Sequence, residues 1–195
     1  MQTFLGKKVN PLDVHPDDID IEDVAHGLSM TCRYGGHTKT FYSVSEHCVL
    51  VSRHVAPEFS REGLLHDVSE YLLGDMVRPL KYQPEMEQFR LAEKRIEETV
   101  IERFGLRPFS DKRVWGAVKN IDNRILLDEM AALMRYPHLY TEDAEGISSE
   151  DGGLHGLEPL GAKILAYPPA MAEVLFLTRF CQLFPEYKRD FEVLS

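Results

Sequence analysis

Residues 63–81 read GLLHDVSEYLLGDMVRPLK, a stretch that places several polar side chains inside an apolar framework. Its leucine and valine residues recur at helical spacing, which predicts a buried helix ending at Gly74. Within it, Glu70 follows His66 by four residues and Asp67 by three, so it lies one turn further along the same side. A carboxylate in a protein core is costly unless a cation compensates it. We therefore expect a metal ion at His66 and Asp67, with Glu70 beside these ligands.

The alternative interpretation treats the His-Asp dipeptide as an exposed pair, because such dipeptides are common by chance. Further candidate ligands elsewhere in the chain favour the metal site. His47 falls in a helix predicted for residues 43–54, which a serine can cap. It precedes His66 by 19 residues, enough for one helix, a turn at Pro57 and the beginning of the next helix. Two antiparallel helices would then bring His47 opposite His66.

A second acidic candidate lies on a long helix predicted over about 110–134. Asp122 sits between two isoleucines of its apolar stripe, which places this carboxylate near the buried edge, where a partner is needed. We predict Asp122 as the fourth ligand. Asp128 and Glu129 are expected to be solvated and are less favoured.

A polar loop over residues 33–43 precedes the helix that carries His47. Arg33, Tyr34 and His37 give this loop cations and an aromatic face. Such a set suits a nucleotide, with guanidinium for phosphate and a ring for base or sugar. A solvated polar loop is the alternative. Three more polar residues follow the end of the helix predicted to finish at Gly74, within reach of a substrate: Asp75, Arg78 and Lys81.

Composition restricts the classes of partner. The chain carries 22 basic and 32 acidic residues, a net charge of −10, which argues against a nucleic acid polymer as a partner but not against a small phosphorylated molecule. Its three cysteines are widely spaced without a CxxC motif, which indicates a reducing, cytoplasmic location. We expect no signal peptide and no membrane partner, because no apolar stretch approaches the roughly 20 residues of a membrane span.

The 195 residues, 44% of them hydrophobic, suit one domain with a real core. Apolar periodicity predicts an all-α bundle of about five or six helices around the metal site, with the core in about 20–134 and a C-terminal helix at 170–184. The long irregular segment 136–169 between them is expected to be a lid, an oligomer contact or disordered in its middle, residues 141–153.

Three blocks of the chain resemble a known family: SEHCVLVSRH (45–54), LLHDVSEYLLGDMVRPLK (64–81) and NIDNRILLDEM (120–130). Their order H…HD…D is that of the HD-domain metal-dependent phosphohydrolases. The blocks are similar to those of the 5′-deoxynucleotidases and of the phage-type deoxynucleoside triphosphate phosphohydrolases, including dATP-specific ones. The resemblance covers roughly residues 32–134.

The resemblance implies a role for each matching residue. One divalent transition-metal ion, whether cobalt, manganese, zinc, nickel or iron, would be held by the four candidate ligands: His47, His66, Asp67 and Asp122. Glu70 would orient or deprotonate the attacking water, and Asp75 would assist proton transfer near the leaving group. Arg33 would contact the substrate phosphate. The nucleotidases usually carry tryptophan after that arginine; this chain has Tyr34 followed by two glycines, which leaves base and sugar selectivity open.

The function expected from these features is metal-dependent hydrolysis of a deoxynucleotide by water attack on the phosphorus nearest the sugar. A monophosphate would release phosphate, and a triphosphate would release triphosphate. Two alternatives stay open: a catalytically silent HD-type nucleotide-binding or interaction module, and a phosphodiesterase on cyclic nucleotides or oligonucleotides. We expect a small-molecule nucleotide as the partner and a homo-oligomer, a dimer or higher, as the assembly.

Overall fold

The computed structural model describes residues 1–136 and 156–190. In these two ranges the chain is all-α, as the sequence predicts, and it contains no β-strand. None of the helices in this part of the chain is long and apolar enough to cross a membrane. The α-helices, connected by turns and short 3₁₀ helices, are α1 (Ile21–Met30), α2 (Val44–His54), α3 (Ser60–Leu65), α4 (Glu70–Leu73), α5 (Arg78–Lys81), α6 (Glu87–Phe104), α7 (Lys112–Leu133) and α9 (Pro169–Leu183).

The long helices begin and end where their capping residues stand. The Asp20 carboxylate accepts the N–H of Glu22 at the beginning of α1, and the Ser43 hydroxyl accepts the N–H of Glu46 at the beginning of α2. Gly105 ends α6 in the left-handed conformation, with a φ of 63°. The bounds of α2 and α7 agree with the predicted helices at 43–54 and about 110–134 within two residues.

The stretch 63–74 differs from the single helix that we predicted. The chain forms α3, then a turn over residues 66–69, then α4. Hydrogen bonds in this turn run from residue i to i−3, as from the N–H of Glu70 to the carbonyl of Asp67. With about three residues per turn instead of 3.6, side chains three apart lie above one another. Glu70 and Asp67 therefore share one side more closely than in an α-helix.

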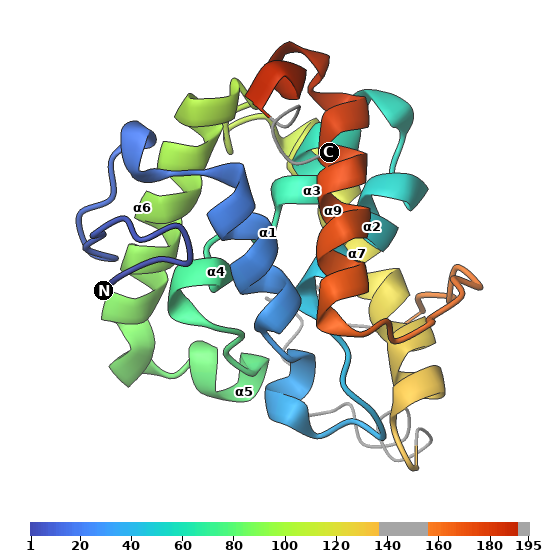
Figure 1. Cartoon of the computed structure of the whole chain (residues 1–195). Coiled ribbons are helices and arrows are strands. Elements are labelled where there is room, and N and C mark those ends of the chain that lie inside the picture. Colours follow the sequence, from blue (N-terminus) through green and yellow to red (C-terminus); the bar gives the residue numbers. More distant parts are fainter. Residues whose placement is uncertain (137–155, 191–195) are drawn as a thin grey trace.

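Close packing of α2 against α3 brings the two predicted histidines together. A Cβ atom on Gly63 would lie 3.2 Å from the Cα of Ser52 and 3.1 Å from the Val55 side chain, so a larger residue would push these helices apart. α1 crosses the other side of α2 and also contacts α4 and α9 (Figure 1). The bundle thus surrounds the segment that carries His66.

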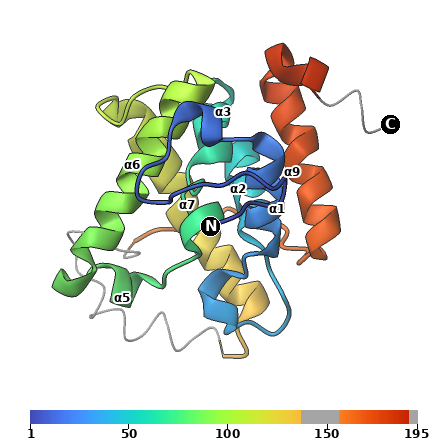
Figure 2. The ribbon, with the colours of Figure 1, turned by 60° about the vertical axis from the view of Figure 1, so that its left-hand side comes forward.

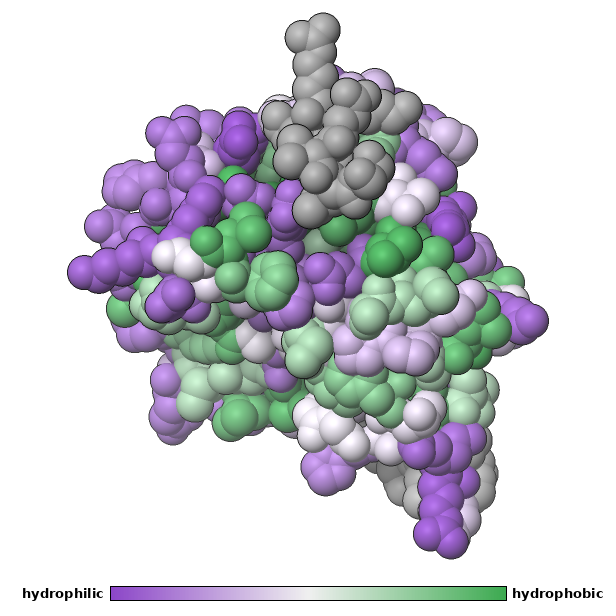
Figure 3. All heavy atoms as spheres, viewed as in Figure 1, coloured by the Kyte–Doolittle hydropathy of each residue, from purple (hydrophilic) through white to green (hydrophobic). Residues whose placement is uncertain are grey.

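Helices α6 and α9 flank α1 in both views of the ribbon (Figures 1 and 2). They meet near their C-terminal ends, where the rings of Phe104 and Phe180 pack edge to face 5.4 Å apart. Hydrophilic side chains gather over the outer face of α6 (Figure 3), as its glutamate, lysine and arginine content predicts. An apolar cluster packs residues from the C-terminal half of α2 against the 3₁₀ helix that precedes α3 and against α7.

Residues 157–168 are irregular, as predicted, and lie across α2 and α7; we call them the strap. The Asp128 carboxylate accepts the N–H groups of residues 160–162 at 3.0–3.1 Å. The Glu46 carboxylate accepts those of residues 165–167 at 2.7–3.1 Å. Main-chain hydrogen bonds to Asp128 and Glu46 thus attach the strap to α7 and α2. The expected disorder of residues 141–153 lies outside the described residues.

Candidate metal centre

The structure brings the four predicted ligands together from three parts of the chain. α2 supplies His47, the turn after α3 supplies His66 and Asp67, and α7 supplies Asp122. His47 Nε2 lies 3.2 Å from His66 Nε2, 3.6 Å from Asp67 Oδ2 and 3.2 Å from Asp122 Oδ1. His66 Nε2 lies 3.3 Å from Asp67 Oδ2. One atom each of His47, His66 and Asp67 fits within a mutual 4.8 Å, and Asp122 joins this group through His47.

The spacings of 3.2–3.3 Å fit a shared divalent ion, and the 3.6 Å spacing between His47 and Asp67 is slightly longer. Two ligand atoms bound at about 2.1 Å to one ion lie about 3.0–3.4 Å apart at octahedral or tetrahedral angles. Two imidazole nitrogens and two carboxylate oxygens suit a first-row transition metal. His47, His66 and Asp67 could therefore share such an ion, with Asp122 beside His47 as the fourth candidate and coordination positions left for water or substrate oxygens.

The two carboxylates of the cluster are held in their ionised form. Burial alone would raise the pKa of Asp67, but the imidazoles of His66 and His47 outweigh it and hold that pKa below its ordinary value. Burial likewise opposes ionisation of Asp122, whereas the His47 hydrogen bond and Lys119 lower its pKa. Conversely, burial lowers the pKa of His66 and Asp67 raises it, with a net increase. The carboxylates and the His66 imidazole therefore stabilise one another in their charged forms.

Glu70 stands beside the cluster with one oxygen unused. The residue is 8% exposed, and within the described residues its Oε2 atom has no hydrogen-bond partner. Burial first, then the carboxylates of Asp67 and Asp75, raise the pKa of Glu70 well above its ordinary value. A buried carboxyl group with an unpaired oxygen is poised to accept a proton or a hydrogen bond from a ligand.

The Arg33 side chain points inward, toward the cluster. It is 7% exposed, its NH1 atom donates to Asp67 Oδ2 at 3.3 Å, and its Nε atom lies 3.3 Å from Glu129 Oε2. Tyr34 adopts a left-handed conformation with a φ of 59°, which is unusual for a residue with a side chain. Its hydroxyl donates to Glu129 and its N–H donates to Asp75 Oδ2 at 2.8 Å. Both residues therefore lie at the site beside carboxylates, and Arg33 Nε, although 3.3 Å from Glu129, has no hydrogen-bond partner among the described residues.

The remaining candidates are distributed around this centre. Arg78 donates to Asp122 Oδ2 and to Asn123 Oδ1, both at 3.1 Å, so it holds a predicted ligand. Lys81 forms a 2.8 Å ion pair with Glu93 of α6. Both lie on α5, a short helix that the sequence analysis did not predict. Asp75 anchors the loop through Tyr34, and His37 is exposed on that same loop.

Glu129 was interpreted wrongly from the sequence. We expected a solvated residue, but Glu129 is 0% exposed and accepts hydrogen bonds from Tyr34, Tyr42 and His47. Burial would raise its pKa, yet Arg33 and His47 lower it to about 2. Its position seven residues after Asp122, two helical turns along α7, is a signal that could have placed it on the buried side.

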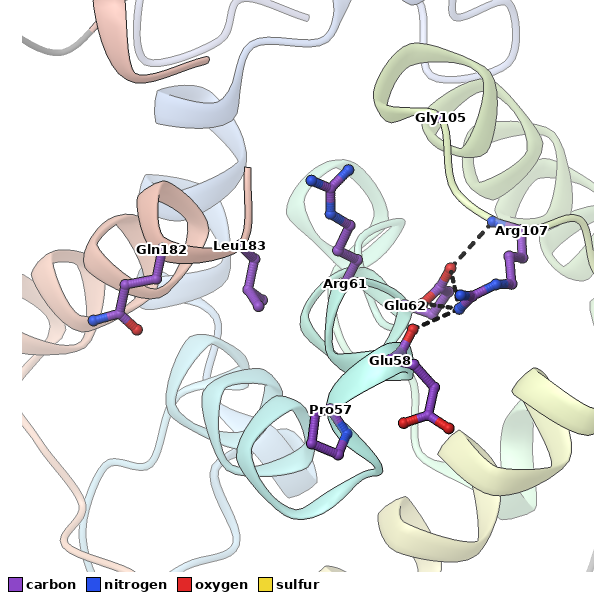
Figure 4. A pocket seen from close by; sticks show the side chains of 8 residues that line it. All are labelled: Pro57, Glu58, Arg61, Glu62, Gly105, Arg107, Gln182 and Leu183. Carbon is purple, nitrogen blue, oxygen red and sulfur yellow. Dashed lines mark hydrogen bonds and ion pairs between the residues drawn. The ribbon is translucent and has the colours of Figure 1, made fainter. Parts of the chain in front are cut away.

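A separate pocket of about 470 Å³ lies away from the cluster, between the beginning of α3, the loop after α6 and the end of α9 (Figure 4). Its cations are already paired. Arg107 binds the Glu62 carboxylate at 3.3 Å, and Arg61 binds Glu186 at 2.9 Å while its guanidinium covers the ring of Phe184. These contacts indicate a structural role for the polar groups of this pocket.

The chain is similar in sequence to two bacterial proteins. No protein-family model matches the chain. It is 39% identical over 108 residues to the uncharacterized protein YfdR of Escherichia coli strain K12, a match that covers 55% of this chain and 60% of YfdR. It is 35% identical over 138 residues to the uncharacterized protein RCAP_rcc00048 of Rhodobacter capsulatus, covering 65% of this chain and 70% of that protein. The chain thus spans less than two thirds of the length of YfdR.

Proposed function

We propose that this chain, which belongs to the family of the uncharacterized protein RCAP_rcc00048 of Rhodobacter capsulatus, is a metal-dependent phosphohydrolase of deoxynucleotides. The observation that carries the proposal is the approach of His47, His66 and Asp67 to one another at 3.2–3.6 Å beside a buried glutamate, with Asp122 3.2 Å from His47. A carboxylate and imidazole cluster next to an unpaired carboxyl group is the arrangement that hydrolysis with a bound divalent ion requires. It also matches the resemblance to HD-domain phosphohydrolases in the sequence.

Each polar group has a place in this chemistry. A divalent ion held by the four ligands would supply a Lewis acid that makes water more acidic and polarises a phosphoryl oxygen. Glu70 accepts the proton of the attacking water, because its Oε2 atom is directed to no other described residue and its raised pKa favours the protonated product. Arg33 offsets negative charge on the phosphoryl oxygens through the N–H groups not bound to Glu129.

The substrate class follows from charge and size. The site places cationic side chains, namely Arg33, Arg78 and Lys81, around an otherwise acidic cluster in a chain of net charge −10. Such local cations suit a small phosphate ester better than a polymer, whose many phosphates need an extended basic face. Water attack at the phosphorus nearest the sugar would release phosphate from a monophosphate or triphosphate from a triphosphate.

A substrate panel tests the proposal. Deoxy- and ribonucleoside mono- and triphosphates, together with cyclic nucleotides, are incubated with the protein and cobalt, manganese, zinc, nickel or iron, and phosphate and triphosphate release are measured separately. We expect hydrolysis of deoxynucleotides that stops in excess chelator. Undiminished turnover by metal-stripped protein in chelator would refute the metal dependence. Hydrolysis restricted to cyclic nucleotides would identify a phosphodiesterase, and binding without turnover a nucleotide-binding module.

A further inference from the structure

Glu129 joins the two halves of the candidate site. Its Oε1 atom accepts from His47 Nδ1 at 2.6 Å and from the Tyr42 hydroxyl at 2.8 Å. Its Oε2 atom accepts from the Tyr34 hydroxyl and lies 3.3 Å from Arg33 Nε. One oxygen therefore faces a predicted metal ligand, and the other faces the residue predicted to bind phosphate.

The bond to His47 determines which nitrogen is free. An ionised carboxylate only accepts hydrogen bonds, so the bond to Glu129 keeps a proton on Nδ1, and a metal ion would take the place of a proton at Nε2 and bind its lone pair. Nε2 is the atom that lies among His66, Asp67 and Asp122. Carboxylates that bind the outer nitrogen of a histidine in this way orient the ring and make it a better metal ligand.

The contact between Glu129 and Arg33 holds the residue that is proposed to bind the substrate phosphate. The guanidinium is buried between Glu129 at Nε and Asp67 at NH1. A cation bound at Asp67 Oδ2 would compete with NH1 for that oxygen, whereas the contact between Nε and Glu129 would remain. Arg33 would then present its outer N–H groups to an anion next to the ion, and it would be held there by Glu129 alone.

We infer that Glu129 is a positioning residue that holds His47 for the metal ion with one carboxylate oxygen and Arg33 for the substrate phosphate with the other. The inference rests on the proposed function and extends it to a residue that touches neither ion nor substrate. It implies that removal of the Glu129 charge weakens metal and phosphate binding together. Removal of the Tyr42 hydroxyl, which binds Oε1, weakens mainly metal binding. Removal of the Tyr34 hydroxyl, which binds Oε2, weakens mainly phosphate binding.

The test uses calorimetric titration of metal-free protein with Co²⁺, and of Co²⁺-loaded protein with inorganic phosphate. For Glu129→Gln we expect Co²⁺ affinity to fall about 10- to 100-fold and phosphate affinity to fall on the order of tenfold. Asp128→Asn is the matched control, because the neighbouring carboxylate on α7 binds only strap N–H groups in the described residues. It should lower the melting temperature of the metal-free protein and leave both affinities unchanged.

Two further variants keep the inference testable if Glu129→Gln does not fold. Tyr42→Phe removes a donor from Oε1 and should weaken Co²⁺ binding about two- to tenfold with phosphate affinity unchanged. Tyr34→Phe removes a donor from Oε2 and should weaken phosphate binding by a similar factor with Co²⁺ affinity unchanged. Equal effects of both variants on both ligands would overturn the division between the two oxygens.

The outcomes separate this inference from the proposed function. If wild-type protein binds no divalent ion, the proposed function is wrong and the inference is wrong with it. If wild-type protein binds Co²⁺ and phosphate, but Glu129→Gln changes only the melting temperature and keeps both affinities within twofold, Glu129 is structural and only the inference is wrong.

Discussion

Two neighbouring regions use carboxylates in different ways. At the strap, Glu46 and Asp128 each accept three main-chain N–H groups. At the candidate metal centre, Asp67 lies beside imidazoles and a guanidinium, Glu70 is buried near the carboxylates of Asp67 and Asp75, and one oxygen of Glu70 has no hydrogen-bond partner in the described residues. The strap carboxylates bind main-chain N–H groups, which do not titrate, whereas Asp67 in the candidate metal centre lies beside imidazoles, whose charge can change. The first arrangement holds a segment, and the second is suited to hold an ion.

The same stretches of helix serve both regions. Glu46 binds the strap while its neighbour His47 faces the cluster, and Asp128 binds the strap while Glu129 supports His47. Adjacent residues of a helix point about 100° apart, so each pair divides between two directions. The difference teaches that the partner of a carboxylate, rather than its burial, indicates whether it serves the fold or the site.

The largest expected effect is on turnover at the candidate metal centre. Glu70→Gln should lower kcat by about 10²–10⁴-fold, because a positioned general base contributes that much. Metal content should stay near that of wild type, because Glu70 is not among the ligands. Asp67→Asn should lose metal and turnover together. The measurements are steady-state kinetics and elemental analysis, and an equal loss of metal in both variants would make Glu70 a ligand.

At the strap, the expected effect is on stability. Glu46→Ala or Asp128→Ala leaves three N–H groups without their charged acceptor, so each should lower the free energy of unfolding by about 3 kcal/mol. Metal affinity should not change, because neither side chain faces the cluster. Urea unfolding of metal-free protein and calorimetric titration measure the two quantities. Loss of metal affinity without loss of stability would contradict the comparison.

A smaller effect depends on pH. Burial and the neighbouring Glu93 raise the pKa of Glu97 from its ordinary 4.5 to about 7. Between these pH values the unfolded chain releases this proton while the folded chain keeps it, so the free energy of unfolding decreases as the pH rises, and the cost is complete above pH 7. Glu97→Gln should therefore stabilise metal-free protein at pH 8 by on the order of 2 kcal/mol and have little effect at pH 4. Thermal unfolding at both pH values, with the exposed Glu98→Gln as control, measures this difference; equal stabilisation at both would contradict it.

The smallest effect is expected on the outer face of α6. Lys94 and Glu98 form a 3.7 Å ion pair one turn apart, with both side chains more than half exposed. Lys94→Ala should change the free energy of unfolding by about 0.5 kcal/mol or less, because exposed pairs contribute little. Urea unfolding provides the measurement. A change of several kcal/mol would show that exposed charges of this protein stabilise the fold as strongly as the strap carboxylates.

Much of the helical framework was predictable, because its signals are local. The caps Asp20, Ser43 and Asp111 bind N–H groups two or three residues away, and apolar residues repeat with the helical period. The same periodicity singled out Asp122, because a carboxylate on an apolar stripe needs a partner wherever the helix packs. The split between α3 and α4 was not predictable from periodicity, because α and 3₁₀ turns place nearly the same residues on the buried side.

The sequence by itself determined that the chain is helical, where the long helices begin and end, and which histidines and aspartates were predicted to lie together. Only the tertiary structure decided that Glu129 binds His47, that Arg33 turns inward and that residues 160–162 and 165–167 are held by Asp128 and Glu46. The reason is the separation along the chain: Glu129 lies 82 residues from His47, and Glu46 lies more than 100 residues from its strap partners. Contacts over such distances depend on how whole helices pack, and adjacent residues carry no signal of them.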